Sequence, residues 1–474
     1  MKNTEKLLSI RHLKQYFPIK KGDLAGGRSY VRANEDVTLD IYRGETLGLV
    51  GESGCGKSTL GRTILQLYRP SAGRVVYYGR SLASFAPAYV EQTLRNAKRE
   101  VAHYRKQVKG LVRLERRCRA SESRGRRLAL LRARIETKRQ GLIALLGGFM
   151  LLDDPREGAA LLLERYRCHV RLCRVTEEQK RAELLSRLDA VEKQLQILRE
   201  RHMQNEEFAR LEAQRDDEGI DLASLTPREM RRLRGDVQIV FQDPYSSLNP
   251  RMTVERILSE GPVTHRMGRP GSADLRAYVL DMMQRCGLQA YMMHRYPHEF
   301  SGGQRQRICI ARALAVDPQF VVCDECVSAL DVSIQSQILN LLQQLKEQNK
   351  LTYLFITHDL SVVRYMADRI GVMYLGDIVE LGEAEEIFGD PRHPYTVALL
   401  SCMPGVDDRQ RETPPLLLKG NIPSPIHPPA GCKFHTRCYM ASEICKQKEP
   451  PLCEVSPGHT VVCHFPDKKI CSPD

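Results

Sequence analysis

Hydrophobic and polar positions follow strand-like and helix-like patterns near the start of the chain and again in its second half. Residues 31–41 alternate with a period of two, which is typical of a half-buried strand. Residues 45–50 form a short apolar run before a glycine-rich turn, and residues 59–68 are predicted to form a helix. Strand and helix patterns alternate again over residues 231–387. These patterns predict an α/β fold.

The middle of the chain has a different pattern, because strong helix formers dominate residues 87–217. An a/d seam typical of a coiled coil passes through Leu184, Leu188, Val191, Leu195 and Leu198. The sequences GRSLASF and GIDLASL, at 79–85 and 219–225, resemble each other. This similarity indicates that the chain leaves one domain near residue 80 and returns to it near residue 220. We therefore predict a helical hairpin or small bundle with coiled-coil character, inserted at 81–219.

Most of the positive charge belongs to this helical stretch. The chain of 474 residues has a formal net charge of +14, and residues 91–140 alone hold 17 Lys or Arg against 5 Asp or Glu. A solvated helical face, a contact with anionic lipid or a membrane partner, and a contact with nucleic acid are the three explanations, and we favour the first. The longest nearly apolar run, 141–152, is too short for a membrane span, and the first residues lack a secretory signal.

A glycine-rich motif of the form G-x-x-x-x-G-K-[ST] lies between a predicted strand and a predicted helix. Its backbone N–H groups are expected to converge on phosphates at the start of the helix. Lys57 would reach the β/γ-phosphates and Ser58 would bind Mg²⁺. The predicted nucleotide-binding residues are Gly51, Ser53, Gly54, Cys55, Gly56, Lys57, Ser58 and Thr59.

A second candidate site lies where the apolar run at 319–323 ends in two carboxylates. Asp324 is predicted to hold Mg²⁺, as acidic residues do at such strand ends in other P-loop NTPases. Glu325 would accept a proton from the attacking water or orient it. Cys323 and Cys326 bracket the two carboxylates as C-x-x-C, which would also suit a redox or metal site. We favour two small buried hydrophobic residues, because free cysteine is among the most buried residue types.

Further motifs identify a family. FQDP at 241–244, FSGGQ at 300–304, SALD at 328–331 and THD at 357–359 join the two motifs above in one order along the chain. The set resembles the ATP-binding subunits of ABC transporters. VFQDPYSSLNPRMTV, HEFSGGQRQRICIARAL, PRHPYTVALLS and the cysteine-rich tail are similar to the oligopeptide/dipeptide importer branch. The likeness covers about 1–80 and 220–466, and it leaves out the insertion.

The resemblance implies a P-loop NTPase fold and an ATPase that powers the import of di- or oligopeptides. We expect the ABC ATP-binding domain at 1–80 and 220–388, with a helical subdomain at about 243–312. A cysteine-rich region of the peptide-transporter type is expected at 389–474.

The resemblance also implies roles for individual residues. Two such domains close head to tail, so that each ATP lies between the P-loop of one and the signature segment of the other. Gln242 would approach Mg²⁺ and the attacking water, and His358 would contact the γ-phosphate. Phe17 would stack on adenine. The residues expected to reach the ATP of the partner domain are Ser301, Gly302, Gly303, Gln304 and Asp331.

The implied partners are transmembrane permease subunits, a second ATP-binding subunit (identical or homologous) and, through the complex, an extracytoplasmic peptide-binding protein. The implied location is peripheral, at the cytoplasmic face of the cell membrane. The alternative is a DNA-associated ABC ATPase with a coiled-coil insertion. The short seam, an insertion without a C-x-x-C pair and the transporter-like tail favour transport, so nucleic acid is not an expected partner. A translation-factor ABC protein would need two P-loops, and one is present.

The tail concentrates cysteines in a segment rich in glycine and proline, which has little apolar sequence for a core. Four thiolates suit Zn²⁺ or a [4Fe–4S] cluster, although the spacing is not that of a C-x2-C zinc ribbon. The resembling importer subunits share the cysteine pattern, and some hold an iron–sulfur cluster there. We therefore favour iron over zinc or free thiols. The expected ligands are Cys432, Cys438, Cys445 and Cys463. Left outside this set are Cys453 and Cys471, with His435, His459 and His464 as possible substitutes.

Overall fold

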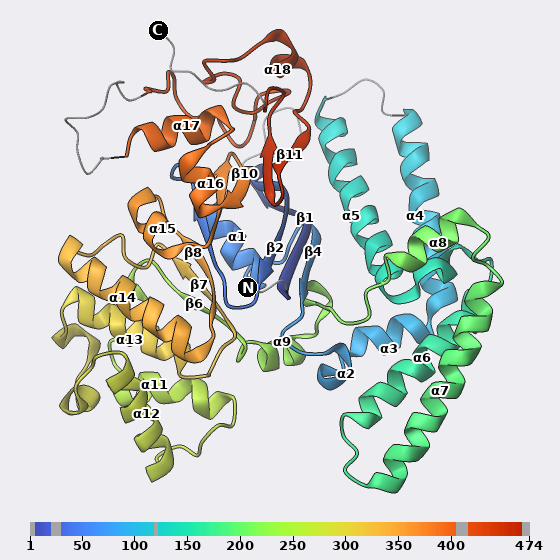
Figure 1. The fold of residues 1–474 in the computed structure, drawn as a ribbon, viewed down its shortest axis with the longest axis horizontal. Helices are drawn as coiled ribbons and strands as arrows, with labels where there is room; N and C mark the ends of the chain where they lie inside the picture. The colour runs from blue at the N-terminus through green and yellow to red at the C-terminus, as the bar shows by residue number, and fades with distance from the viewer. Residues whose placement is uncertain (1–4, 20–29, 118–121, 404–415, 467–474) are drawn as a thin grey trace. The chain divides into compact units, whose positions relative to one another are not determined.

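The computed structural model describes residues 5–19, 30–117, 122–403 and 416–466 of the chain (Figure 1). Cys471 lies outside the described residues. The chain divides into two compact units. The P-loop unit comprises Met1–Lys6, Lys14–Arg69 and Arg231–Asp474. The helical unit comprises Leu7–Leu13 and Pro70–Met230.

An eight-stranded sheet forms the centre of the P-loop unit, with the order β11-β12-β10-β9-β3-β8-β7-β6. The strands from β6 to β9 in this order pair in parallel, and β9, β10, β12 and β11 pair antiparallel. The strand bounds are β3 Thr46–Val50, β6 Val237–Val240, β7 Phe320–Asp324, β8 Thr352–Ile356, β9 Arg369–Tyr374, β10 Asp377–Glu383, β11 Leu452–Ser456 and β12 His459–Val462. A second sheet has the order β2-β1-β4-β5, with β1 at Lys6–Pro18 and β2 at Tyr30–Tyr42.

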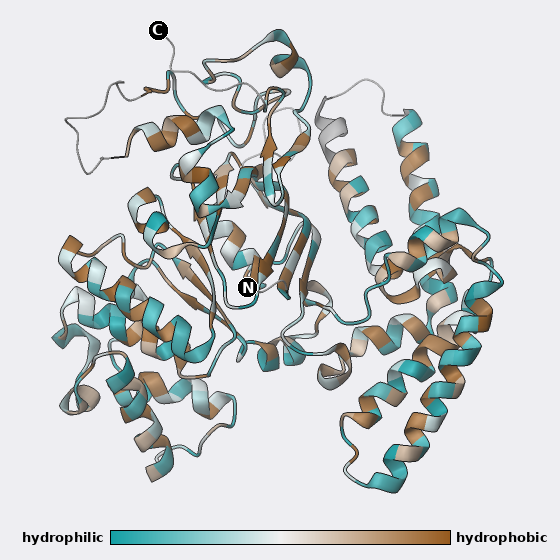
Figure 2. Cartoon of the chain, viewed as in Figure 1, coloured by the Kyte–Doolittle hydropathy of each residue, from teal (hydrophilic) through white to brown (hydrophobic). Residues whose placement is uncertain are grey.

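The central parallel strands are short apolar runs, and every residue of β3, β7 and β8 is buried. Strands of a parallel sheet are covered on both faces, which explains why they lack the alternation seen in β2. In Figure 2 hydrophobic colouring is concentrated in these strands and on parts of the helices. Because β3 and β7 both run parallel to β8, their carboxyl ends lie at one edge of the sheet. Ligands bind at this edge in open α/β sheets.

The helices between β6 and β7, together with α14 and α15, share one apolar cluster with residues of β6, β7 and β8. The helix bounds are α1 Lys57–Ile64, α10 Pro244–Ser247, α11 Val254–Thr264, α12 Ala273–Arg285, α13 Gly302–Leu314, α14 Val332–Asn349, α15 Leu360–Met366, α16 Ala384–Gly389, α17 Pro394–Ser401 and α18 Glu443–Gln447; η3 Ala290–His294 and η4 Pro297–Glu299 are 3-10 helices. The helix predicted at 59–68 extends beyond the C-terminal end of α1 in the structure. The chain leaves α1 at Leu65, and Gln66 has a positive φ of 55°.

The C-terminal region is tied to the P-loop unit by buried polar contacts. Glu380 on β10 accepts hydrogen bonds from the backbone N–H groups of Arg392 and His393 at 2.7 and 3.0 Å. His459 on β12 lies 2.8 Å from the same carboxylate through Nε2. Phe434 is buried against the rings of Tyr374, Tyr395 and His393. The cysteine-rich tail therefore has both a polar and an aromatic attachment to the sheet.

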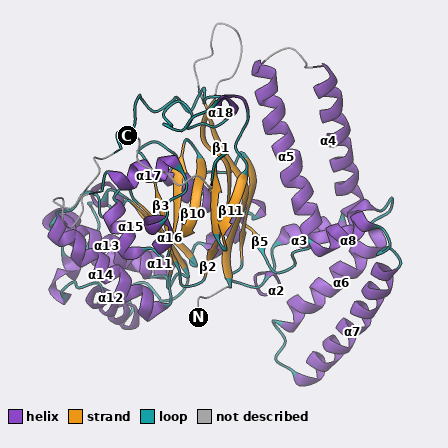
Figure 3. Ribbon diagram, turned by 45° about the horizontal axis from the view of Figure 1, so that its top comes forward, coloured by secondary structure: helices purple, strands orange, loops and turns teal. Residues whose placement is uncertain are grey.

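From α2 to α8 the described residues of the helical unit form helices joined by short connections, as Figure 3 shows. Its edges are β4 and β5, which pair antiparallel with Val76 opposite Asp221. The bounds are β4 Ala72–Tyr77, α2 Leu82–Phe85, α3 Ala88–Arg95, α4 Ala97–Arg117, α5 Glu122–Leu146, η1 Gly147–Leu151, α6 Arg156–Leu172, α7 Glu178–Glu200, α8 Glu206–Ala213, β5 Ile220–Asp221 and η2 Leu222–Ser224; α9 Pro227–Leu233 follows.

The helical unit has its own core. The rings of Phe149 and Phe208 meet edge to face with centroids 5.5 Å apart, and both side chains are buried. Gly158 on α6 lies so close that an added Cβ would stand 2.5 Å from the Phe149 ring. Along the predicted seam on α7, Val191, Leu195 and Leu198 are buried, and the two earlier leucines are half-buried. The inserted helices therefore bury apolar surface against one another.

Among the helices of the described residues, none combines the length and the apolar character that a membrane crossing requires.

Candidate functional site

The glycine-rich loop joins the end of β3 to the start of α1, as the motif predicts. Gly56 is the N-cap of α1 with φ 106°, a left-handed conformation that favours glycine. A Cβ at this position would lie 2.1 Å from the carbonyl oxygen of Ala33. The Nζ atom of Lys57 is turned into the loop, where it donates to the carbonyl oxygens of Gly51 and Glu52 at 2.7 and 3.1 Å. The loop therefore encloses a buried ammonium group at a helix N-terminus, which suits an anion.

The remaining loop residues lie around this ammonium group. Ser53 and Gly54 are exposed, and Ser58 and Thr59 are half-buried. Cys55 is buried, with its sulfur 3.8 Å from the Nζ atom of Lys57. Burial raises the pKa of the Cys55 thiol, so it behaves as a small apolar side chain of the loop.

Asp324 ends β7 with only 1% of its surface exposed. Its Oδ2 atom accepts a hydrogen bond from Nη2 of Arg62 at 3.1 Å, and its Oδ1 atom is buried without a hydrogen-bond partner among the described residues. A buried carboxylate oxygen without a partner is costly unless a cation or donor binds it. Asp324 therefore has the burial and the free oxygen that a Mg²⁺ ligand needs. Arg62 on α1 belongs to no recognised motif, and sequence reasoning missed it.

The side chain of Glu325 contacts residues of two other motifs. Its Oε2 atom accepts a hydrogen bond from Nε2 of Gln242 at 2.7 Å, and its Oε1 atom lies 3.5 Å from Nδ1 of His358. Glu325 has a positive φ of 49°, and its N–H donates to the carbonyl oxygen of Ile356 at 2.9 Å. The structure thus brings the three predicted catalytic residues together at the carboxyl ends of β6, β7 and β8.

The signature segment and Asp331 lie at other helix starts. Ser301 caps α13, where its Oγ accepts from the N–H of Gln304 at 3.4 Å and its own N–H donates to Oε1 of Gln304 at 3.1 Å. Ser301 and Gly302 are exposed, whereas Gly303 packs so closely that a Cβ would lie 2.5 Å from Ile334. Asp331 is the exposed N-cap of α14. Within the described residues, no hydrogen bond or ion pair joins Ser301–Gln304 or Asp331 to the P-loop.

The predicted adenine-stacking residue lies on β1. The ring of Phe17 meets the ring of Tyr68 edge to face, with centroids 5.2 Å apart. Phe17 is half-buried, so part of its ring is accessible. The neighbouring Tyr16 hydroxyl bonds to the carboxylate of Glu35, and burial together with this carboxylate raises the pKa of Tyr16. Tyr16 and Phe17 are both half-buried, and Phe17 stays the predicted stacking residue.

Cys323 and Cys326 are both buried. A hydrogen bond between their side chains raises the pKa of the Cys323 thiol, and burial raises it further. Thiolates are the reactive form of cysteine, so this environment favours two inert thiols beside the carboxylates.

A link between the tail and the P-loop was not foreseen from the sequence. Arg437 donates two hydrogen bonds to the carboxylate of Glu52, at 2.7 and 2.9 Å. The N–H of Glu52 donates to the hydroxyl of Tyr395 at 2.9 Å. The paired carboxylate raises the pKa of Arg437. Glu52 occupies a variable position of the glycine motif, so its partner could be found only from the fold.

Three of the four tail cysteines have raised pKa values. Burial raises the pKa values of Cys432 and Cys438 to about 11 and about 12, and the charges of neighbouring tail thiols raise them further. The same two causes raise the pKa of Cys463, where Cys445 is among the neighbours. Even so, no group of three or more His, Cys, Asp or Glu side chains in the described ranges is arranged to hold a metal ion. Cys453, His435 and His464 have backbone contacts, and His459 is paired with Glu380.

Two family models match the chain. The model described as "ABC transporter" matches residues 34–215 and 202–328, and the model described as "Oligopeptide/dipeptide transporter, C-terminal region" matches residues 379–445. Among solved structures, a dimeric bacterial ABC transporter cassette has a TM-score of 0.45 at 17% identity and covers 80% of this chain and 99% of that one.

Curated relatives match in the same way. The chain is 34% identical over 467 residues to the oligopeptide transport ATP-binding protein AppF of Bacillus subtilis (strain 168), covering 98% of each chain. It is 50% identical over 246 residues to the oligopeptide transport ATP-binding protein OppF of Salmonella typhimurium, covering 52% of this chain and 73% of that one. The predicted P-loop NTPase fold and ATPase class are thereby confirmed. The chain belongs to the family of ABC transporter ATP-binding proteins, among the relatives of the oligopeptide transport ATP-binding proteins.

Proposed function

We propose that this chain is the ATP-hydrolysing subunit of an ABC importer for di- or oligopeptides. The observation that carries the proposal is the convergence of Gln242 and His358 on Glu325, directly after the buried Asp324. The names of AppF and OppF, and the match of the tail to an oligopeptide/dipeptide transporter region, support the peptide substrate. ATP hydrolysis would supply the energy for transport.

Each residue of the site has a proposed role. The P-loop N–H groups and Lys57 would hold the phosphates, with Gly51, Ser53 and the residues up to Thr59 forming the loop. Glu325 would take a proton from the attacking water, Gln242 would orient this water and His358 would contact the γ-phosphate. The contacts of Gln242 and His358 with Glu325 support a joint role of these three residues in hydrolysis.

Mg²⁺ fits this donor set. Ser58, Gln242 and Asp324 offer a hydroxyl, an amide and a carboxylate, which are the oxygen ligands that Mg²⁺ prefers. The Oδ1 atom of Asp324, buried without a hydrogen-bond partner in the part of the chain that the structure describes, supports this assignment. When bound, the ion would neutralise charge on the phosphate oxygens.

The proposed active assembly contains two ATP-binding subunits, identical or homologous. Ser301, Gly302 and Asp331 are exposed, and among the described residues no hydrogen bond or ion pair joins them to this chain's own P-loop, which supports a nucleotide shared with a partner subunit. Phe17 would stack on adenine. The proposed domains are 1–80 with 220–388, an insertion at 81–219 and a tail at 389–474. Permease subunits and an extracytoplasmic peptide-binding protein would complete a complex in which this chain lies at the cytoplasmic membrane face.

We also propose a [4Fe–4S] cluster on Cys432, Cys438, Cys445 and Cys463. The match of the tail to an oligopeptide/dipeptide transporter region supports this proposal, and the backbone N–H of Cys432 donates to the carbonyl oxygen of Cys445 at 2.8 Å. The four thiolates would each hold one iron atom of the cluster. The cluster would have a structural role. Iron and sulfide analysis after anaerobic purification tests it, and a protein with neither iron nor zinc would refute a metal in the tail.

The proposed hydrolysis is tested by Glu325→Gln, with Glu347→Gln on the exposed side of α14 as the matched control. Glutamine keeps the size of the side chain but is a far weaker proton acceptor, so phosphate release should fall by about 10²- to 10⁴-fold. Nucleotide binding, measured separately, should stay close to that of the unmodified chain. Turnover close to normal in Glu325→Gln would remove this residue from the catalytic role.

A further inference from the structure

The helical unit contains a cavity of about 380 Å³. This volume lies within the range of about 300–1,000 Å³ that is typical of small-molecule sites. The cavity is formed by helices α2, α3, α5 and α6 together with the segment that follows α8. All of its lining residues belong to the helical unit, so the cavity is built by the insertion alone.

One part of the cavity is apolar. Its wall consists of side chains that are less than one-tenth exposed, from four different helices: Leu82, Val90, Leu94, Leu145 and Leu162. Aliphatic side chains of this kind offer no hydrogen bonds, so they favour a hydrocarbon body over water.

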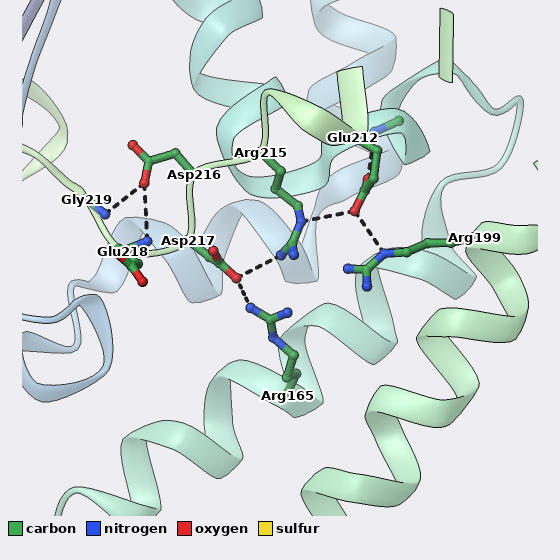
Figure 4. Close-up of polar contacts among 9 residues, drawn as sticks. Arg165, Arg199, Glu212, Arg215, Asp216, Asp217, Glu218 and Gly219 are labelled. Carbon is green, nitrogen blue, oxygen red and sulfur yellow. Dashed lines mark hydrogen bonds and ion pairs between the residues drawn. The ribbon is translucent and has the colours of Figure 1, made fainter. Parts of the chain in front are cut away.

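The other part is lined by two largely buried arginines, Arg165 on α6 and Arg215 after α8. Both guanidinium groups bond to the carboxylate of Asp217, as Figure 4 shows. The distance from Nη1 of Arg215 to Oδ2 of Asp217 is 3.0 Å. Tyr166 and His169, one and four residues after Arg165, also line the cavity. The apolar wall therefore ends at a group of polar and cationic side chains.

A third arginine adds to the positive charge. Nε of Arg199 on α7 lies 2.9 Å from Oε1 of Glu212, and Nε of Arg215 donates to the same oxygen at 3.1 Å. The other oxygen of Glu212 accepts the N–H of Gly148 at 3.0 Å. The Nη2 atom of Arg199 is buried and has no hydrogen-bond partner in the part of the chain that the structure describes. Two carboxylates are thus shared among three guanidinium groups.

Burial and the neighbouring arginines both oppose the charged form of these guanidinium groups. Burial, followed by the charges of Arg215 and Arg199, lowers the pKa of Arg165 to about 10. Burial and Arg199 also lower the pKa of Arg215. Glu192 and Glu212 act in the opposite direction on Arg165. Glu192 is exposed, as is Glu218, which also lines the cavity, so solvent screens both of these carboxylates. An additional anion at this place would relieve the repulsion.

We propose that this cavity binds an anionic amphiphile, a small molecule with one carboxylate or similar anionic head and a hydrocarbon body. The head lies against Arg165 and Arg215, whose planar guanidinium groups match carboxylate and phosphate oxygens in pairs. The hydrocarbon body lies along the apolar wall. The proposal does not depend on ATP hydrolysis or on the transported substrate, and it gives the insertion a ligand of its own.

The experiment uses decanoate as the probe, at concentrations below micelle formation, and the full chain as the protein. Calorimetric titration should detect saturable binding of decanoate. Decanol lacks the anionic head, decyltrimethylammonium reverses its charge, and acetate lacks the hydrocarbon body, so all three should bind at least about tenfold more weakly. Equal binding of decanoate and decyltrimethylammonium would overturn the proposal, as would no binding of decanoate.

Variants locate the site. Arg165→Gln should weaken decanoate binding by about 10- to 100-fold, because it removes a charged hydrogen-bond donor. Arg156→Gln is the matched control, since Arg156 on the same helix pairs with exposed Asp154 and does not line the cavity. If Arg165→Gln loses its helical circular dichroism, Val90→Phe serves instead, because it fills the apolar wall and leaves the arginines in place. Unchanged affinity in the folded variant would overturn the assignment to this cavity.

Discussion

Asp324 of the P-loop unit and Arg165 of the helical unit are both charged side chains held largely out of water, but their surroundings arise in different ways. Asp324 is the last residue of a buried strand, and its neighbours in the site follow the ends of adjacent strands. Arg165, Arg199 and Arg215 come from α6, α7 and the segment after α8, with no fixed spacing between them.

The difference shows in which architecture a short stretch of sequence is enough to specify the residues of a site. In a parallel sheet the carboxyl ends of neighbouring strands meet at one edge, so a few residues in each loop suffice to build a site. In packed helices the partners are set by which faces meet, and a charged residue looks the same in the sequence whether it faces solvent or a cavity.

The largest expected effect concerns backbone space in the P-loop unit. Gly56→Ala places a Cβ 2.1 Å from the carbonyl oxygen of Ala33 at a φ of 106°, so we expect ATP affinity to fall by about a hundredfold or more. Gly54→Ala is the matched control, because Gly54 also has a positive φ but an added Cβ would have nothing within 4 Å. Gly54→Ala should lower ATP affinity by about tenfold or less. If Gly56→Ala and Gly54→Ala lose the same ATP affinity in fluorescent-nucleotide titrations, then backbone strain in the loop, and not the contact with Ala33, sets the affinity.

The next prediction compares one histidine in each unit, buried His393 and half-buried His169. Burial lowers the pKa of His393 to about 4, so the folded chain keeps it neutral while the unfolded chain binds a proton below about pH 6.5. The stability that neutral His393 supports is complete above this pH and is lost as the pH falls toward 4. Between pH about 7.5 and about 5 the loss should be about 2 kcal/mol.

Urea unfolding at the two pH values, followed by circular dichroism, measures this loss. His393→Gln should reduce the pH dependence. His169→Gln, in the helical unit, should reduce it less, because burial also lowers the pKa of His169 but leaves that ring more accessible. An equal change in both variants would contradict the assignment to His393.

A smaller effect is expected at the link between tail and P-loop. Arg437→Gln removes the two hydrogen bonds that the guanidinium group donates to the carboxylate of Glu52. We expect ATP affinity to fall by about tenfold. Lys446→Gln is the control in the same tail, since Lys446 pairs with Glu443 on an exposed surface. Unchanged affinity in Arg437→Gln would mean that the loop holds its shape without the tail.

The smallest effect on ATP should come from removing residues 88–216. All of the motifs that resemble ABC proteins lie outside this segment, so ATP affinity and turnover should stay within about twofold. The same truncated chain should lose the binding of decanoate completely. A folded truncation that no longer binds ATP would show that the two units depend on each other, and one that still binds decanoate would move that site elsewhere.

The strand-end chemistry was accessible from the sequence, because Lys57, Asp324 and Glu325 lie in motifs whose spacing is fixed by the turns that hold them. The fold class and the helical character of the insertion followed from hydrophobic period and composition. Arg62 and Arg437 were not accessible, since each meets its carboxylate partner only through long-range packing. The cavity of the helical unit was also out of reach, because no periodic pattern separates its arginines from those on the solvated surface.

The pairing of β4 with β5 has a consequence for the time course of folding. Arg74 and Asp221 form an ion pair at 2.9 Å although 147 positions separate them. Closing such a loop from a flexible chain costs about 3 kcal/mol more than closing a hairpin of a few residues. Helices form within microseconds from local contacts, and once α3 to α8 have packed, the two strands no longer need to find each other across a long coil. We therefore expect β5 to join its sheet late, after the insertion has become compact. The residues that follow 230, which carry every remaining motif of the ATP site, would then assemble onto a chain whose middle is already folded.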